Sequence, residues 1–172
     1  MNGALVRLRP MEPADAEAQH RWRNDPDVTV WTGWRYPIAR AAIAQRIVGP
    51  MSFANPRFSV ERLDTGELVG YTALRDVTPE SRNGELDLVI GERSAWGQGF
   101  GTDTARTICA YAFERIGLHR VQLWVVASHA PAIRAYEKAG FVPEGVARQR
   151  FYKRGAWHDA LLMARLAPGP RP

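Results

Sequence analysis

The stretch AWGQGFGTDTAR, residues 95–106, carries glycine at three alternate positions, Gly97, Gly99 and Gly101. It follows the apolar run 86–90 and precedes a segment with helical periodicity, so the glycines lie where a strand passes into a helix. The first amides of a helix are unpaired and partly positive, and glycine lets a phosphate approach them. The stretch therefore predicts either an anion-binding turn or simply a tight strand-to-helix turn.

The spacing excludes several familiar catalytic and nucleotide-binding motifs. A Rossmann loop needs its third glycine at Thr102, and a Walker loop needs a lysine that this stretch lacks. The G-x-S-x-G elbow of serine hydrolases is absent. The four histidines do not have the spacing of metal ligands, so we expect no metal.

Composition is that of one soluble domain. The 172 residues are 45% hydrophobic and 24% charged, and a single cysteine excludes an internal disulfide. There is no signal-peptide core and no apolar run of membrane-spanning length, so we expect a cytoplasmic protein that does not enter the membrane. The net charge of +5 comes from arginines scattered along the chain, which disfavours nucleic acid and suits a polyphosphate cofactor.

Hydrophobic periodicity and turn residues predict the order of elements. Strands are expected at 4–9, 58–63, 68–74, 84–90, 120–126, 141–152 and 157–166, and helices at 13–24, 38–48, 101–116 and 131–139. The segment 28–37, rich in tryptophan and glycine, is expected to be a loop. Because some strands are joined by hairpins and others by a helix, the pattern predicts one α/β domain with a mixed sheet over 1–167. Residues 168–172 form a frayed tail rich in proline and glycine.

Three segments resemble the GNAT superfamily of N-acetyltransferases, in particular the branch of ribosomal-protein N-terminal and spermidine acetyltransferases. Residues 96–101, WGQGFG, match the family motif Q/R-x-x-G-x-G/A with Trp96 at its first position. Residues 129–141, HAPAIRAYEKAGF, match N-x-x-A/S-I-x-x-Y-E-K-x-G-F with His129 in place of asparagine. Residues 8–28 look like the opening of that branch.

The resemblance implies a single GNAT-like α+β domain. Its sheet would be mostly antiparallel, with a splayed central strand pair and flanking helices. It also implies acetyl-CoA as co-substrate. The pyrophosphate is expected to contact the amides of Gln98, Gly99, Phe100, Gly101 and Thr102. The pantetheine arm is expected to pair with the main chain of Leu88, Val89 and Ile90. His129 is expected to contact the cofactor as well.

Acetyl transfer from a thioester to an amine needs help with protons, because alkylamines have a pKa of about 10 and thiols of about 8.5. The family motif assigns the general acid to Tyr136, although periodicity alone makes it a packing residue of its helix. Glu85 is our candidate for the base, and strand alternation places Asp87 on the same face, beside the acceptor amine. An exposed strand face with solvated charges is the alternative for both carboxylates.

In this superfamily the acceptor is chosen by the first helices and the last hairpin. Here we expect Trp31, Trp34, Tyr36 and Tyr152 to line an acceptor cleft for a protein N-terminus or a small-molecule amine. The excess of arginine mildly disfavours a polycation. The same aromatic residues hint at a homodimer, and a non-catalytic acyl-CoA sensor and a nucleic-acid-binding module remain alternatives.

Overall fold

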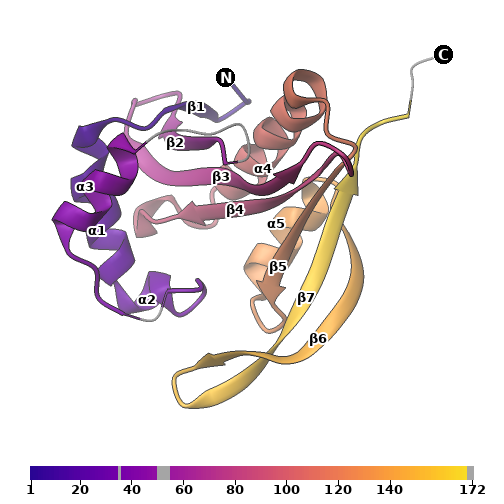
Figure 1. The fold of residues 1–172 in the computed structure, drawn as a ribbon. Coiled ribbons are helices and arrows are strands. Elements are labelled where there is room, and N and C mark those ends of the chain that lie inside the picture. The colour runs from indigo at the N-terminus through magenta and orange to yellow at the C-terminus, as the bar shows by residue number, and fades with distance from the viewer. Residues whose placement is uncertain (35, 50–54, 170–172) are drawn as a thin grey trace.

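A computed structural model describes residues 1–34, 36–49 and 55–169 (Figure 1). Within these residues seven strands form one sheet in the order β1-β2-β3-β4-β5-β7-β6, in which only the β4–β5 pair is parallel. The strands are β1 Val6–Pro10, β2 Arg57–Arg62, β3 Leu68–Thr78, β4 Asn83–Ile90, β5 Arg120–Val126, β6 Val142–Lys153 and β7 Ala156–Leu166. The predicted single α/β domain with a mixed, mostly antiparallel sheet is confirmed.

The α-helices follow the predicted order with one addition, and short 3-10 turns lie at Pro13–Asp15 and Arg93–Ala95. The α-helices are α1 Ala16–Asn24, α2 Pro26–Thr29, α3 Arg40–Val48, α4 Phe100–Tyr111 and α5 Ala130–Lys138, with a π-helical turn, Ala112–Ile116, after α4. Helix α2 occupies part of the segment that we expected to be a loop. Pro26 stands at its first position, and the Asp25 carboxylate accepts the amide of Asp27 at 2.8 Å, so the residues that end α1 also begin α2.

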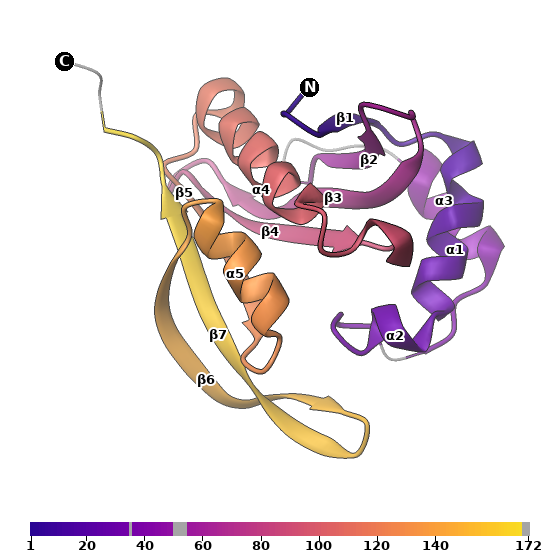
Figure 2. The same ribbon diagram turned by 180° about the vertical axis from the view of Figure 1, so that it is seen from behind.

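Helices α4 and α5 pack together on one face of the sheet, and α1 and α3 lie toward the β1–β4 side of the other face (Figures 1 and 2). The main core, between the strands and α4, includes Leu8, Leu74, Ile108 and Leu123. A smaller cluster joins Trp22 of α1 to the opposite face of β3 and β4. The sheet therefore has one large and one small apolar layer, and the small one leaves room for polar residues.

Strands β4 and β5 are paired over a short stretch only. Their ladder joins Asn83 to Arg120, Gly84 to Val121 and Glu85 to Gln122, and no later pair is formed among the described residues. Beyond Glu85, β4 continues its pairing with β3, and β5 its pairing with β7. The predicted splay of the central strand pair is thus confirmed, and it begins at the candidate base.

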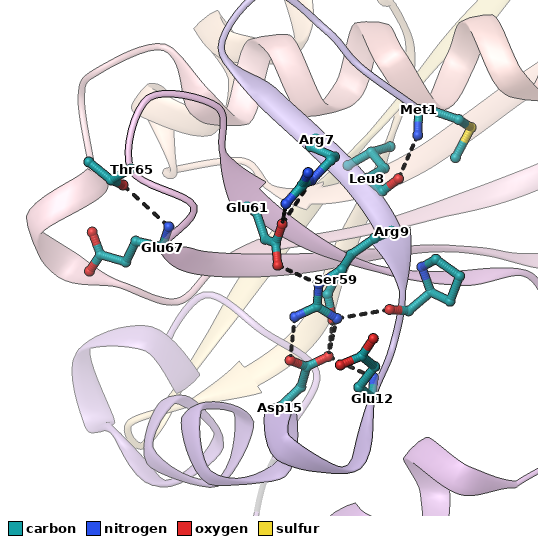
Figure 3. A network of polar contacts seen from close by, with 11 residues as sticks. Met1, Arg7, Leu8, Arg9, Glu12, Asp15, Ser59, Glu61, Thr65 and Glu67 are labelled. Atoms are coloured by element: carbon teal, nitrogen blue, oxygen red, sulfur yellow. Dashed lines mark hydrogen bonds and ion pairs between the residues drawn. The ribbon is translucent and has the colours of Figure 1, made fainter.

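A buried polar network fixes the start of α1 to the sheet (Figure 3). The Asp15 carboxylate accepts two hydrogen bonds from Arg9, at 2.8 and 2.6 Å, one from the Ser59 hydroxyl at 2.6 Å and one from the Glu12 amide at 2.8 Å. Arg9 also binds Glu61 of β2. Burial alone would raise the pKa of Asp15, but the hydrogen bond from Arg9 and those from Glu12 and Ser59 outweigh it and lower that pKa.

The boundary of the domain at residue 167 stays a prediction. Pro168 and Gly169 belong to no helix or strand and are exposed, and residues 170–172 of the predicted tail lie outside the described residues. None of the helices in the described ranges is long and apolar enough to cross a membrane.

Candidate active site

The glycine turn shapes the start of α4. Gly99 caps the helix with φ +90°, Gly97 has φ +75°, and the first main-chain bond of the helix runs from the Asp103 amide to the Gly99 carbonyl at 3.0 Å. The amides of Phe100, Gly101 and Thr102 therefore precede the hydrogen-bonded ladder. A Cβ added to Gly97 would meet nothing within 4 Å. This turn has both the exposed main chain and the partial positive charge that a phosphate needs.

Helix α4 is held in place by its own first turn. The buried Asp103 carboxylate accepts the amides of Ala4, Leu5 and Val6 at 3.1, 2.7 and 3.0 Å, which ties the helix to the entry of β1. Thr102 donates to the Ala135 carbonyl at 3.3 Å and so connects α4 to α5. The position of the glycine turn therefore depends on contacts with two other elements.

Next to this turn, the main chain of β4 faces the side from which β5 has parted. The Gly91 amide donates to the Val69 carbonyl of β3 at 2.9 Å, and antiparallel pairs alternate between bonded and non-bonded. The alternation directs the main chain of Leu88 and Ile90 away from β3, and that of Val89 toward it. Of the three residues expected to hold the pantetheine arm, Leu88 and Ile90 thus have the required orientation.

Trp96, the residue that departs from the family motif, has a structural partner. Its indole nitrogen donates to the Ile90 carbonyl at 2.7 Å, while the Gln98 amide nitrogen donates to the Ser94 carbonyl. The indole thus uses the carbonyl of Ile90 at the end of β4. The main-chain groups of Leu88 stay available to a ligand.

Tyr136 lies on α5, partly buried and edge-on to Phe141 with the ring centroids 5.8 Å apart. Its hydroxyl has no hydrogen-bond partner among the residues described. Burial, with a further contribution from the charge of Asp87, raises the pKa of Tyr136 above its ordinary value near 10. The side chain is therefore a protonated donor at neutral pH that has no acceptor of its own.

The two carboxylates of β4 have different surroundings. Glu85 accepts a hydrogen bond from Arg75 at 2.8 Å and forms an ion pair with it. No hydrogen bond or ion pair engages the Asp87 carboxylate in the described part of the chain, and its charge acts on both Tyr136 and Tyr71. Asp87 thus acts on Tyr136 through its charge, and it also lines the cavity described next.

A cavity of about 330 Å³ lies between α1, α3 and the strands β2, β3 and β4. Its charged lining residues are Arg23, Arg46, Arg57, Arg75 and Asp87. Tyr71 lines it as well, and its hydroxyl is buried with no hydrogen-bond partner in the described structure. The cavity is therefore strongly basic, and Asp87 is the acidic residue in its lining.

Arg23 is the most buried of these arginines, with 6% of its surface exposed. Its guanidinium lies over the rings of Trp34, at 4.0 Å, and Tyr71, at 5.1 Å, and those two rings are themselves stacked. Its Nε atom has no partner among the described residues. Trp34, expected from the sequence to line an acceptor cleft, therefore lies at the edge of this cavity through its contact with Arg23.

The other aromatic candidates lie elsewhere. Trp31 stacks on His129, with ring centroids 4.1 Å apart. Tyr152 lies against Trp157 in the β6–β7 hairpin and, with Gly33, lines a second cavity of about 280 Å³. Tyr36 is 80% exposed. The structure thus does not gather the four aromatic residues in one cleft, and their substrate contacts stay predictions.

His129 is the residue before α5, and its side chain makes no capping hydrogen bond. Burial lowers the pKa of His129 from 6.5 to about 4, so the ring is neutral at physiological pH. Its expected contact with the cofactor stays a prediction.

Sequence reasoning missed the basic lining of the cavity. The predicted helix 13–24 and strand 68–74 contain Arg23 and Tyr71, but neither residue was assigned a role in the site. The available signal was that Gln19 and Arg23 are four residues apart on α1, on the side that also buries Ala16. Two polar residues on a buried helix face indicate a polar cavity beneath it. Groups of three or more histidine, cysteine, aspartate or glutamate side chains suited to a metal are absent from the described part of the chain.

Comparison with known proteins agrees with this geometry. The family model described as "Acetyltransferase (GNAT) domain" matches residues 6–142. The putative ribosomal N-acetyltransferase YdaF of Bacillus subtilis is 30% identical over 167 residues, covering 94% of this chain and 91% of the relative. The spermidine N(1)-acetyltransferase of Vibrio cholerae is 29% identical over 166 residues, covering 95% and 93%.

A solved structure shows the same fold. The spermidine N-acetyltransferase from Vibrio cholerae in complex with CoA and spermine superposes with a TM-score of 0.81 at 25% identity, covering 94% of this chain and 95% of that one. The glycine turn, the parted strands and the tyrosine of α5 thus lie in a fold whose structural neighbour holds CoA. The chain therefore belongs to the GNAT family of acetyltransferases, enzymes that use acetyl-CoA as co-substrate.

Proposed function

We propose that this chain transfers an acetyl group from acetyl-CoA to a primary amine by direct attack of the amine. The observation that carries the proposal is that β4, among the described residues, is unpaired with β5 from beyond Glu85 to its end at Ile90, where it meets the glycine turn of α4. The amides of residues 98–102 would hold the pyrophosphate, and the main chain of Leu88 and the amide of Ile90 would hold the pantetheine arm. The cofactor supplies the activated acetyl group as a thioester.

Tyr136 is the proposed general acid. Its raised pKa keeps the proton on the hydroxyl at neutral pH, and no described residue accepts that proton. As the bond between the acetyl carbon and sulfur breaks, a proton donated from Tyr136 would neutralise the departing thiolate. A thiolate is costly in an apolar site, so this donation contributes more there than it would in water.

The base is a choice between Glu85 and Asp87. Glu85 is the residue expected from the family resemblance, but its carboxylate is already engaged by Arg75 in an ion pair. Asp87 lines the basic cavity and acts electrostatically on Tyr136. We therefore favour Asp87 as the group that takes the ammonium proton, directly or through water, with Glu85 positioning Arg75.

The acceptor belongs to the class of primary amines. By their names, one relative is a spermidine N(1)-acetyltransferase and another is a putative ribosomal N-acetyltransferase. Either kind of amine would have to reach the cavity side of β4, past Trp34. Trp31, Tyr36 and Tyr152 are proposed to contact the outer part of an acceptor.

The test is a thiol-release assay with acetyl-CoA across peptides, polyamines, aminoglycosides and amino acids, with the acetylated product identified by mass. We expect turnover with at least one class, and a loss of about 10²- to 10⁴-fold in kcat for Tyr136→Phe with acetyl-CoA affinity retained. Binding of acetyl-CoA without turnover on any amine would refute the proposal and favour an acyl-CoA sensor.

A further inference from the structure

The basic cavity contains two buried polar groups that lack partners. The Nε atom of Arg23 and the hydroxyl of Tyr71 are both buried, and both residues line the cavity. Leaving such groups without partners is costly, and burial of an unpaired charge costs more. Two orphaned donors on one cavity indicate a missing acceptor.

The charges around the cavity specify the kind of acceptor. Arg23 and Arg46 form no ion pair among the described residues, although the charge of Asp87 acts on Arg23. Arg57 donates only to the main-chain carbonyls of Arg46 and Gly49. Since the guanidinium of Arg46 repels that of Arg23, an anion between them would relieve repulsion as well as satisfy donors.

The acidic residue that lines the cavity, Asp87, suits an amine. Asp87 lines the same cavity, is free of hydrogen bonds to described residues, and lies close enough to Tyr136 for its charge to be felt there. A ligand with its amine at Asp87 and its anion at Arg23 would satisfy both groups. The guanidinium of Arg23 is held between Trp34 and Tyr71 before any ligand arrives, so little side-chain entropy is lost on binding.

We infer that the acceptor is a small amine that also carries a carboxylate, and that Arg23 and the Tyr71 hydroxyl bind this carboxylate while Asp87 receives the amine. The inference rests on the proposed function, because it names the substrate of that reaction. It makes Arg23 and Tyr71 specificity-determining residues. A polyamine would instead place a second cation among the arginines.

The test compares acceptors that differ only in the carboxylate. Amino acids are paired with their amides, and ω-amino acids of increasing length are paired with the corresponding alkylamines, with spermidine included. For the best pair we expect kcat/KM to be about 10- to 100-fold higher with the carboxylate. Equal or higher kcat/KM for the neutral partner or for spermidine would overturn the inference.

Two variants assign the preference to its residues. Tyr71→Phe removes only the hydroxyl, and Arg23→Met replaces a buried unpaired charge with an apolar chain of similar length. Each is expected to lower kcat/KM for the carboxylate acceptor by about tenfold or more while leaving the neutral partner within about threefold. Arg40→Met is the matched control, since Arg40 is exposed, pairs with Glu17 and does not line the cavity. An unchanged ratio in both test variants would contradict the inference.

A binding experiment distinguishes a failure of this inference from a failure of the proposed function. Calorimetry with the N-acetyl amino acid, the product of the proposed reaction, needs no turnover. Wild-type protein should bind it more tightly than its amide, and Arg23→Met should remove the difference. If this holds while no amine is acetylated, the carboxylate site stands and the proposed function fails; if amines are acetylated but the acid and amide bind alike, the inference fails alone.

Discussion

The indole of Trp31 lies flat against the imidazole of His129, with ring centroids 4.1 Å and planes 14° apart. Trp31 follows α2, and His129 lies between β5 and α5. The stack therefore connects the segment after α2 to the end of β5 that is not paired with β4. The Lys153 ammonium donates to the Thr32 carbonyl and fixes the same segment to the last hairpin. The segment after α2 is thus anchored on two sides.

This stack makes stability depend on pH. The pKa of His129 is about 4 in the folded protein and about 6.5 when unfolded, so the unfolded state binds more protons between these values. We expect the free energy of unfolding to fall as pH drops from about 6.5 to 4, by on the order of 1–3 kcal/mol for this group after allowing for its partial exposure.

The control is His129→Phe, which keeps a ring on Trp31 but cannot titrate. Its thermal unfolding should lose less stability over the same pH range than the wild type. Parallel curves for the two proteins would show that His129 titrates at its ordinary pKa and is not buried by the stack.

The two carboxylates of β4 can be separated by matched substitutions. We expect Asp87→Asn to lower kcat by about 10²-fold or more, and Glu85→Gln, which leaves Arg75 without its charge partner, to lower it by less than about tenfold. Single-turnover rates measured from pH 6 to 9 are the readout. The reverse order of effects would assign the base to Glu85.

Gly101→Ala tests the phosphate turn without disturbing the fold. Gly101 has no positive φ, and an added Cβ would meet only the Ile90 side chain at 3.7 Å, so the unfolding temperature should be unchanged or slightly raised. The same Cβ would crowd a bound pyrophosphate, and we expect the KM for acetyl-CoA to rise about tenfold. Gly145→Ala, in open space on β6, is the control and should change neither quantity. An unaltered KM in Gly101→Ala would place the phosphates elsewhere.

The network around Asp15 should govern stability rather than chemistry. Asp15→Ala leaves the half-buried Arg9 with only Glu61 and the Pro10 carbonyl and deprives the Ser59 hydroxyl of its acceptor, and we expect a loss of about 2–4 kcal/mol in the free energy of unfolding. Because the pKa of Asp15 is lowered on folding, its contribution is present above about pH 4 and is lost in acid. Urea unfolding at pH 7 and pH 3 measures both effects. Asp64→Asn, at an exposed pair with Arg62, is the control and should leave the curves unchanged.

Much of the fold follows from local sequence. The strand at 120–126 and the end of the central helix at Gly117 agree with the structure because a period of two and a left-handed glycine are local signals. Helix α2 was missed because Asp25–Pro26 can end one helix and begin the next. The π-helical turn after α4 continues the same apolar face, so the sequence pattern does not reveal it.

The site was predictable only where it is made of contiguous residues. The glycine turn and the motif around Tyr136 can be read along the chain. The basic cavity cannot, because it brings Arg23 of α1 and Arg46 of α3 over Tyr71 and Asp87, which neighbouring strands place on one face. That juxtaposition depends on the packing of helices on the sheet, which no local pattern encodes.

The most direct measurement is a crystal structure of the protein with CoA bound. We expect the pyrophosphate within about 3.2 Å of at least two amide nitrogens between Gln98 and Thr102. The pantetheine arm should lie beside Leu88, and its sulfur should point toward the Tyr136 hydroxyl. CoA bound elsewhere would contradict the account, and so would hydrogen-bonded pairing of β4 with β5 beyond Glu85 in the complex.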